Sequence, residues 1–238
     1  MAMKGIVFFD MEGTLLRKAY HLDDGKVAPS AWTLLAEALG EECLAEENKT
    51  KDIWISGGYE SYLEWMQSST IIHKKYGLHR DLFYRIINSV ELTKNTQLAI
   101  KRIKELNFKT VLISGGFKAL ADRVQVELEI DHSFSACEYF FDKESGLLRH
   151  MNLLPTDEAG KADFMHLMCR EYKISPSNCA FVGDGMNDIH LAQQVGYSIS
   201  FNGQKKLKDV ASAHISQKTG EEDFMPVFDL INSWHSIQ

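Results

Sequence analysis

Short apolar runs alternate with segments of helical spacing over much of this 238-residue chain. The first run, residues 4–9, carries almost no charge, which is typical of a strand buried on both faces of a parallel sheet. Further strands are expected at 110–113, 138–141, 147–150, 179–182 and 197–201, with helices at 98–106, 117–128, 161–172 and 186–195. The strands at 138–141 and 147–150 fit a hairpin. The alternation predicts an α/β fold with a doubly wound, Rossmann-like and mostly parallel sheet.

One long interruption, residues 15–93, contains no convincing buried strand. Its pattern predicts helices at 30–39, 59–76 and 80–90, with Ser30 as an N-cap and Gly40 as a stop. The acidic stretch at 41–47 is interpreted as a solvated helix face or a turn. We therefore predict a core domain of residues 1–14 and 94–238, and a small helical cap domain of residues 15–93 inserted into it.

Composition narrows the class of protein further. The net charge of −7 does not favour an extended surface for nucleic acid or an anionic membrane. The four cysteines lack metal-binding spacing and a disulfide framework, and no apolar run is long enough to span a bilayer. The start of the chain is not typical of a signal peptide. We expect a cytoplasmic monomer or homodimer without nucleic-acid or membrane partners.

Two carboxylates stand where the first expected strand ends. Asp10 and Glu12 follow this strand, and Gly13 allows a sharp bend directly after them. In open α/β sheets, ligands bind beyond the carboxyl ends of the strands, so we expect chemistry here. One carboxylate of such a pair can attack a substrate while its neighbour moves a proton.

Two further segments carry groups that bind phosphate. Ser114 and Gly115 lie in an expected loop between a strand and a helix, where a hydroxyl and exposed backbone N–H groups form an anion-binding corner. Lys161 opens a later helix and can neutralise a phosphoryl group as a compact point charge. Taken singly, the first segment fits an ordinary turn, and the lysine fits a solvated surface residue.

An acidic cluster follows the strand expected at 179–182. Asp184 and Asp188 lie in a loop with two glycines, and carboxylate oxygens are the ligands that Mg²⁺ prefers. Asn187 can hydrogen-bond to a phosphoryl group or hold a neighbouring carboxylate. A helix start with acids near its positive end accounts for one of these residues but not for the cluster.

In this order, the four sites resemble the haloacid-dehalogenase-like superfamily of phosphohydrolases over the full chain. Residues 113–117 (ISGGF) and 183–188 (GDGMND) look most like its phosphoserine-phosphatase-like branch, whose members place a small helical cap between the first two motifs. The resemblance implies that Asp10 is a nucleophile that forms an aspartyl-phosphate, and that Glu12 is the general acid and base. It implies Mg²⁺ bound by Asp10, the backbone carbonyl of Glu12 and Asp184, with Asp188 in support. The implied phosphoryl-binding residues are Ser114, Gly115, Lys161 and Asn187.

Two departures from the family pattern bear on the substrate. Glu12 is one methylene longer than the usual aspartate, and a related branch with phosphotransferase ability also carries glutamate here. In the phosphoserine enzymes a glutamate and an arginine of the cap read the substrate, but residues 29–32 (PSAW) and 64–67 (EWMQ) contain no recognisable equivalent. The cap segment is instead rich in aromatic residues, interpreted chiefly as cap interior and alternatively as a wall of the catalytic cleft: Trp54, Tyr59, Tyr62, Trp65 and Tyr76.

The expected function is a Mg²⁺-dependent phosphatase that hydrolyses a small phosphorylated metabolite through an aspartyl-phosphate. Two alternatives stay open. One is a phosphotransferase that passes the group from Asp10 to an alcohol, and the other is a regulatory protein that binds a phosphometabolite without catalysis.

Overall fold

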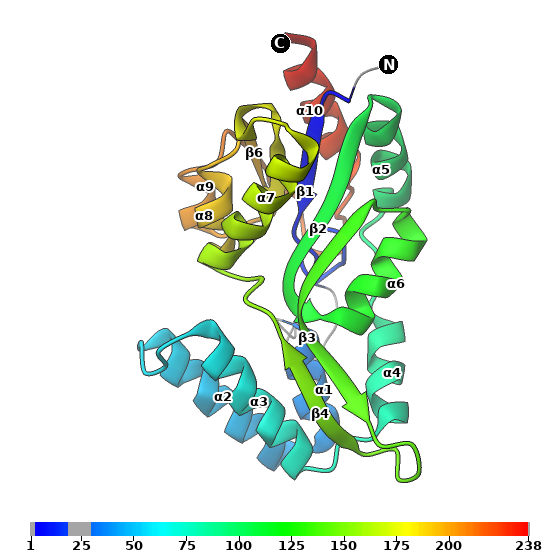
Figure 1. Ribbon diagram of the computed structural model, residues 1–238, viewed down its shortest axis with the longest axis vertical. Helices are drawn as coiled ribbons and strands as arrows, with labels where there is room; N and C mark the ends of the chain where they lie inside the picture. The colour runs from blue at the N-terminus through cyan, green and yellow to red at the C-terminus, as the bar shows by residue number, and fades with distance from the viewer. Residues whose placement is uncertain (1–2, 19–29, 238) are drawn as a thin grey trace.

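The computed structural model describes residues 3–18 and 30–237 (Figure 1). Part of the expected cap segment, including Pro29, lies outside the described residues. Within these ranges, seven strands form one sheet in the order β4-β3-β2-β1-β5-β6-β7. Neighbouring strands are parallel except for the antiparallel pair β3 and β4. The strands are β1 (Gly5–Phe9), β2 (Phe108–Phe117), β3 (His132–Phe141), β4 (Leu148–Leu153), β5 (Ala180–Gly183), β6 (Tyr197–Phe201) and β7 (Ala213–Ile215).

Helices cover both faces of this sheet, which confirms the expected doubly wound α/β fold (Figure 1). Successive residues of β1 point to opposite faces: Val7 and Phe9 belong to one buried cluster, and Ile6 and Phe8 to the other. The first cluster includes residues of α5 (Thr96–Glu105), α6 (Lys118–Leu128) and α10 (Met225–Ile237). The second includes residues of α7 (Ala159–Tyr172), α8 (Ile189–Ala192) and α9 (Lys205–Lys208). Burial on both sides explains why β1 has no polar face.

Four of the helices between β1 and β2 lie within residues 15–93, where an insertion was expected: α1 (Ala31–Leu39), α2 (Glu41–Ile55), α3 (Tyr62–Lys75) and α4 (Arg80–Ser89). Helix α2 extends well beyond the acidic stretch that was interpreted as a solvated helix face or turn. Its buried residues are Cys43, Glu47 and Thr50, which have helical spacing but mixed polarity. A search for apolar periodicity misses such a face. The exact division into core and cap domains stays a prediction.

The end of β2 differs from expectation. The strand continues to Phe117, so Ser114 and Gly115 lie in β2 and not in a loop after it. Pairing with β3 is irregular between Ser114 and Phe117, a bulge of the kind that often lies beside active sites. The neighbouring strands β3 and β4 also run on beyond the core, toward α3 (Figure 1). The helix expected at 186–195 is also divided, into a 3-10 turn (Met186–Asp188) and α8.

Elements near the C-terminus were not anticipated from the pattern: α9, β7 and α10. The four cysteines are buried free thiols. Among the described residues, the helices are too short or too polar to cross a membrane.

Candidate active site

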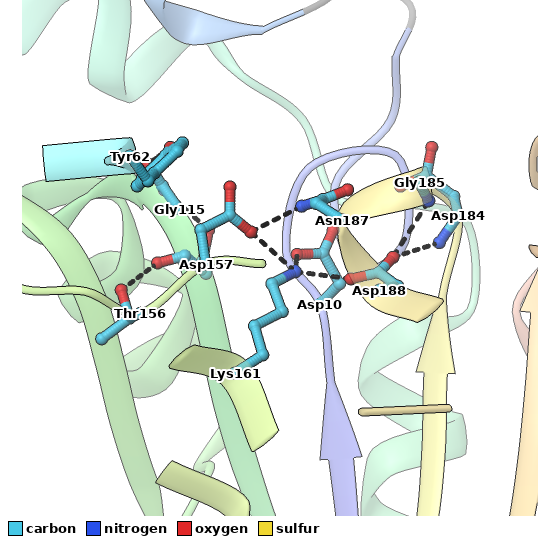
Figure 2. A network of polar contacts seen from close by, with 12 residues as sticks. Asp10, Tyr62, Gly115, Thr156, Asp157, Lys161, Asp184, Gly185, Asn187 and Asp188 are labelled. Carbon is cyan, nitrogen blue, oxygen red and sulfur yellow. Dashed lines mark hydrogen bonds and ion pairs between the residues drawn. The ribbon is translucent and has the colours of Figure 1, made fainter. Parts of the chain in front are cut away.

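The predicted site residues converge at the carboxyl edge of the sheet. Asp10 directly follows β1, and its backbone N–H donates to the carbonyl of Val182 in β5 at 2.9 Å. Asp184 directly follows β5, and Ser114 lies in the bulged part of β2. Since β1 pairs with both β2 and β5, these residues come together although more than 170 positions separate the first from the last. Figure 2 shows the resulting polar network.

Lys161 is at the centre of this network and is fully buried (Figure 2). Its Nζ lies 2.6 Å from Asp10 Oδ1, 2.5 Å from Asp188 Oδ1 and 3.6 Å from Asp157 Oδ1. One ammonium group therefore faces three carboxylates with little water to screen them. Because Lys161 is buried among these carboxylates, its interpretation as a solvated surface residue is wrong.

Asp188 uses both of its carboxylate oxygens within the protein. Its Oδ1 accepts from Lys161, and its Oδ2 accepts from the backbone N–H groups of Asp184 and Gly185, each at 2.9 Å. These contacts hold the loop after β5 in a closed turn (Figure 2). Asp188 thus orients both the lysine and the neighbouring Asp184.

The buried carboxylates have raised pKa values. Burial raises the pKa of Asp10 well above its ordinary value, and the charges of Asp188 and Asp184 add to this, while Lys161 opposes it. Burial likewise raises the pKa of Asp184, although an ion pair with Lys18 lowers it. For Lys161, burial acts to lower the pKa, but the charges of Asp10 and Asp188 outweigh it and the pKa is raised. The site accordingly holds an excess of mutually repelling negative groups.

The donor set fits a divalent cation. Carboxylate oxygens of Asp10, Asp184 and Asp188 lie within 4.8 Å of one another, and all three residues are buried. A few carboxylates with room for water and substrate oxygens are the arrangement that suits Mg²⁺. A cation among them would also relieve the repulsion that raises the pKa values of Asp10 and Asp184.

Glu12 connects this edge of the sheet to the first inserted helix. Its Oε1 accepts a hydrogen bond of 2.7 Å from the backbone N–H of Ala31, the first residue of α1. Ser30, expected to cap this helix, makes no side-chain cap hydrogen bond. The Glu12 carboxylate therefore takes that place, where the positive end of the helix favours negative charge. The extra methylene of glutamate gives it this reach.

Ser114 and Gly115 are fixed by contacts from other segments. Ser114 Oγ accepts from the Gly116 N–H at 3.0 Å, and the Ser114 carbonyl accepts from Thr156 Oγ1 at 2.7 Å. The Gly115 carbonyl accepts from the hydroxyl of Tyr62 in α3 at 3.0 Å. This last bond joins the inserted helices to the predicted phosphate-binding segment.

Two residues at the site, Asp157 and Lys18, were missed from the sequence, and the hydrogen bond of a third, Tyr62, was not foreseen. Asp157 accepts from Asn187 Nδ2 at 2.7 Å and faces Lys161, so Asn187 holds a carboxylate as one interpretation foresaw. The spacing of four between Asp157 and Lys161 was the available signal. Lys18, which pairs with Asp184, and Tyr62 Oη carry no local signal, because their partners are distant in the chain.

A cleft of about 380 Å³ opens over the network and is lined by Asp10, Glu12, Ser114, Gly115, Asp184 and Asn187. Trp54, Tyr62 and Trp65 form another part of its wall and are only half-buried. The interpretation of the aromatic residues as cap interior is therefore wrong for these three. Tyr59 and Tyr76 are absent from the residues lining the cleft.

Comparison with known proteins places this arrangement in a family. The model of haloacid dehalogenase-like hydrolases matches residues 5–196. Phosphoserine phosphatase of Archaeoglobus fulgidus is 29% identical over 219 residues, which are 90% of this chain and 57% of that protein. Phosphoserine phosphatase of Lactococcus lactis is 25% identical over 221 residues, which are 92% of this chain and 93% of that protein. The chain thus spans little more than half of the first relative.

Solved structures agree with the fold. A crystal structure of phosphoserine phosphatase in its apo form has a TM-score of 0.75 at 18% identity, covering 96% of this chain and 98% of that one. A phospho-aspartyl intermediate analogue of phosphoserine phosphatase has a TM-score of 0.74 at 18% identity, covering 96% and 99%. The resemblance to the phosphoserine-phosphatase-like branch is confirmed. The chain belongs to the haloacid dehalogenase-like hydrolase family.

Proposed function

We propose that this protein is a Mg²⁺-dependent phosphomonoester hydrolase that acts on a small phosphorylated metabolite through an aspartyl-phosphate. The observation that carries the proposal is the buried Asp10 carboxylate, held by Lys161 through Oδ1 and open to the cleft beside Glu12. The relatives named as phosphoserine phosphatases support the reaction class. Phosphoserine is the nearest named substrate, although the cap segment lacks the recognisable residues that read it.

The first step transfers the phosphoryl group to Asp10. Because Oδ1 accepts from Lys161, Oδ2 is the oxygen left to attack phosphorus. A bond forms between Oδ2 and phosphorus as the bond from phosphorus to the substrate oxygen breaks. Glu12 donates a proton to that leaving oxygen, so an alcohol departs.

The second step releases phosphate. Glu12, now ionised, takes a proton from water, and the resulting hydroxide forms a bond to phosphorus while the bond to Asp10 breaks. Inorganic phosphate leaves, and both carboxyl groups return to their starting protonation. The contact of Glu12 Oε1 with Ala31 orients this carboxyl group at the cleft for proton transfer in both steps.

Charge neutralisation supports both steps, since phosphoryl transfer depends on positioning and electrostatics more than on further covalent chemistry. Lys161, the Ser114 hydroxyl and backbone N–H groups at Gly115 would contact the phosphoryl oxygens. Asp10, Asp184 and the Glu12 carbonyl would hold Mg²⁺, with Asp188 in support. When bound, Mg²⁺ supplies positive charge against the phosphoryl oxygens.

The test is phosphate release from a panel of phosphomonoesters, phosphoserine included, with Mg²⁺ or with EDTA. We expect release that requires Mg²⁺ and that is abolished in Asp10→Asn. Hydroxylamine trapping of wild type during turnover should convert Asp10 to a hydroxamate, because acyl phosphates react with this nucleophile. Turnover that persists in Asp10→Asn contradicts the proposal.

The same panel separates the alternatives. A new phosphoester formed when an alcohol is added identifies a phosphotransferase. Phosphometabolite binding without any Asp10 hydroxamate identifies a regulatory protein. The cytoplasmic location and the monomeric or homodimeric state stay predictions from the sequence.

A further inference from the structure

A second cavity of about 190 Å³ adjoins the catalytic cleft among the inserted helices, and we name it the cap pocket. It shares five lining residues with the cleft: Ser30, Trp32, Lys51, Tyr62 and Trp65. Cavities of about 150 Å³ can accommodate benzene, so a single substituted ring fits this volume. A phosphomonoester with its phosphoryl group at Asp10 would extend its leaving group toward this space.

Three aromatic side chains line the cap pocket, Trp32, Tyr62 and Trp65, and other contacts hold the two tryptophan rings in place. Trp32 packs on Phe117, with ring centroids 4.3 Å apart. Trp65 stacks on Trp54 at 5.2 Å with an interplanar angle of 9°, and its Nε1 donates to Thr50 Oγ1 at 3.1 Å. Because these rings are already ordered, a planar ligand can pack on them with little additional loss of conformational entropy.

The acidic residue of the cap pocket, Glu47, is buried and bonded to a histidine. Glu47 Oε2 lies 2.8 Å from Nε2 of the buried His73, and His73 Nδ1 lies 2.9 Å from Tyr139 Oη. Tyr139 Oη also lies 3.3 Å from Thr70 Oγ1. The Glu47 carboxylate is therefore already bonded to a buried side chain of the protein.

Lys51 is the positively charged residue of the cap pocket. It is half-buried, lines both the cap pocket and the cleft, and has no ion pair among the residues that the structure describes. The pocket thus combines aromatic rings and polar side chains such as Thr33 and Asn48 with one cation that has no ion pair in the described part of the chain. A partly desolvated ammonium group of this kind favours an anionic group on a ligand and disfavours a cationic one.

We propose that the cap pocket binds a planar ring with an anionic substituent, so that the substrate is a phosphomonoester of a carboxylated aromatic alcohol or phenol. This inference rests on the proposed phosphatase function. The ring packs between Trp32 and Trp65, and the carboxylate pairs with Lys51. An ammonium group, as in phosphoserine or phosphoethanolamine, would face Lys51 within this pocket, where the Glu47 carboxylate is already bonded to His73.

The first test compares kcat/KM for phenyl phosphate, 4-carboxyphenyl phosphate, phosphoserine and phosphoethanolamine. We expect the carboxylated ester to be preferred over phenyl phosphate by about tenfold, the effect of one well-placed ion pair away from bulk water. Lys51→Gln should remove that preference. Lys49→Gln is the matched control, since Lys49 lies on the same helix, is exposed and is absent from the lining of both cavities.

The second test measures binding without turnover. Three of the four tryptophans line the cleft, so intrinsic fluorescence should report binding of 4-hydroxybenzoate to the Mg²⁺-loaded full chain. We expect binding that is tighter than for phenol and about tenfold weaker in Lys51→Gln. Binding of this kind without phosphate release from any ester would support the pocket and contradict the phosphatase function. Phosphate release without preference for the carboxylated ester, or a preference that survives in Lys51→Gln, would overturn the inference and leave the phosphatase function intact.

Discussion

Lys161→Met is the substitution for which the structure gives the clearest energetic expectation. Methionine has nearly the same length and volume as lysine, so the loss of packing is small. The variant leaves Asp10, Asp157 and Asp188 without the buried cation that now contacts all three. Removal of one partner from a buried ion pair typically costs about 3–5 kcal/mol, and we expect a loss of this size in the free energy of unfolding.

The loss should depend on pH in a defined direction. Burial raises the pKa of Asp10 in the folded protein, so the folded state binds more protons than the unfolded state. The folded state therefore loses stability as pH rises through this raised pKa. The pKa of Lys161 is raised, so its stabilisation is complete below the unfolded pKa of lysine and is lost only as pH rises through the raised folded value. Without Lys161 the carboxyl pKa values rise further. The deficit of the variant should therefore be larger at about pH 8 than at about pH 5.

The assay is urea unfolding in EDTA at both pH values, with Lys109→Met as the matched control. Lys109 pairs with Asp131 at 2.7 Å but is partly exposed, so its loss should cost less than about 1 kcal/mol. Adding Asp10→Asn to Lys161→Met should recover about 1–3 kcal/mol, because it removes an uncompensated buried charge. Equal costs for the two lysine variants at about pH 8 would refute the idea that Lys161 neutralises buried carboxylates.

Three further predictions concern the cleft. Glu12→Gln should keep the hydrogen bond to Ala31 and the stability of the protein but lower kcat by about 10²-fold or more. Glu12→Asp should lose about 1 kcal/mol of stability, because the helix cap is lost. Matching stabilities for the two variants would contradict the capping role. Gly115→Ala should lower kcat/KM by about tenfold or more, because the new Cβ would lie too close to Asp157 Oδ2 and only 2.6 Å from Tyr62 Oη. If the variant instead has wild-type kinetics, these groups move aside freely and the prediction is wrong. Mg²⁺ at about 100 times its Kd should stabilise the wild type by about 2.7 kcal/mol in thermal unfolding, and the absence of a shift relative to EDTA would contradict a metal site in the buried acidic cluster.

Much of the fold could be anticipated because a parallel sheet makes local patterns informative. Strands such as β1 and β5 are buried on both faces and therefore appear as uninterrupted apolar runs. Helix α2 was underestimated because Glu47 and Thr50 occupy buried positions that a hydrophobic scan treats as exposed. The extension of β2 to Phe117 was missed because Gly115 and Gly116 are typical of turns, whereas here they occupy a bulge opposite β3.

The principal residues of the candidate site could also be located from the sequence. Asp10 and Asp184 each follow a strand directly, and topology alone brings the carboxyl ends of parallel strands to one edge. Lys161 was identified only as a member of an ordered set, since a single lysine carries no signal of burial. Its complete burial depends on the tertiary arrangement of Asp10 and Asp188, which makes an ammonium group stable there.

The amino-acid pattern was thus sufficient for the fold class, for the position of the candidate site residues at the strand ends and for the family, because each depends on local order along the chain. Contacts between distant segments could not be read in this way. The bond from Glu12 to Ala31, the bond from Tyr62 to Gly115 and the aromatic pocket with Lys51 exist only once the inserted helices pack over the sheet edge. Such contacts depend on the relative position of whole elements, which is set by many packing interactions at once and by no single stretch of sequence.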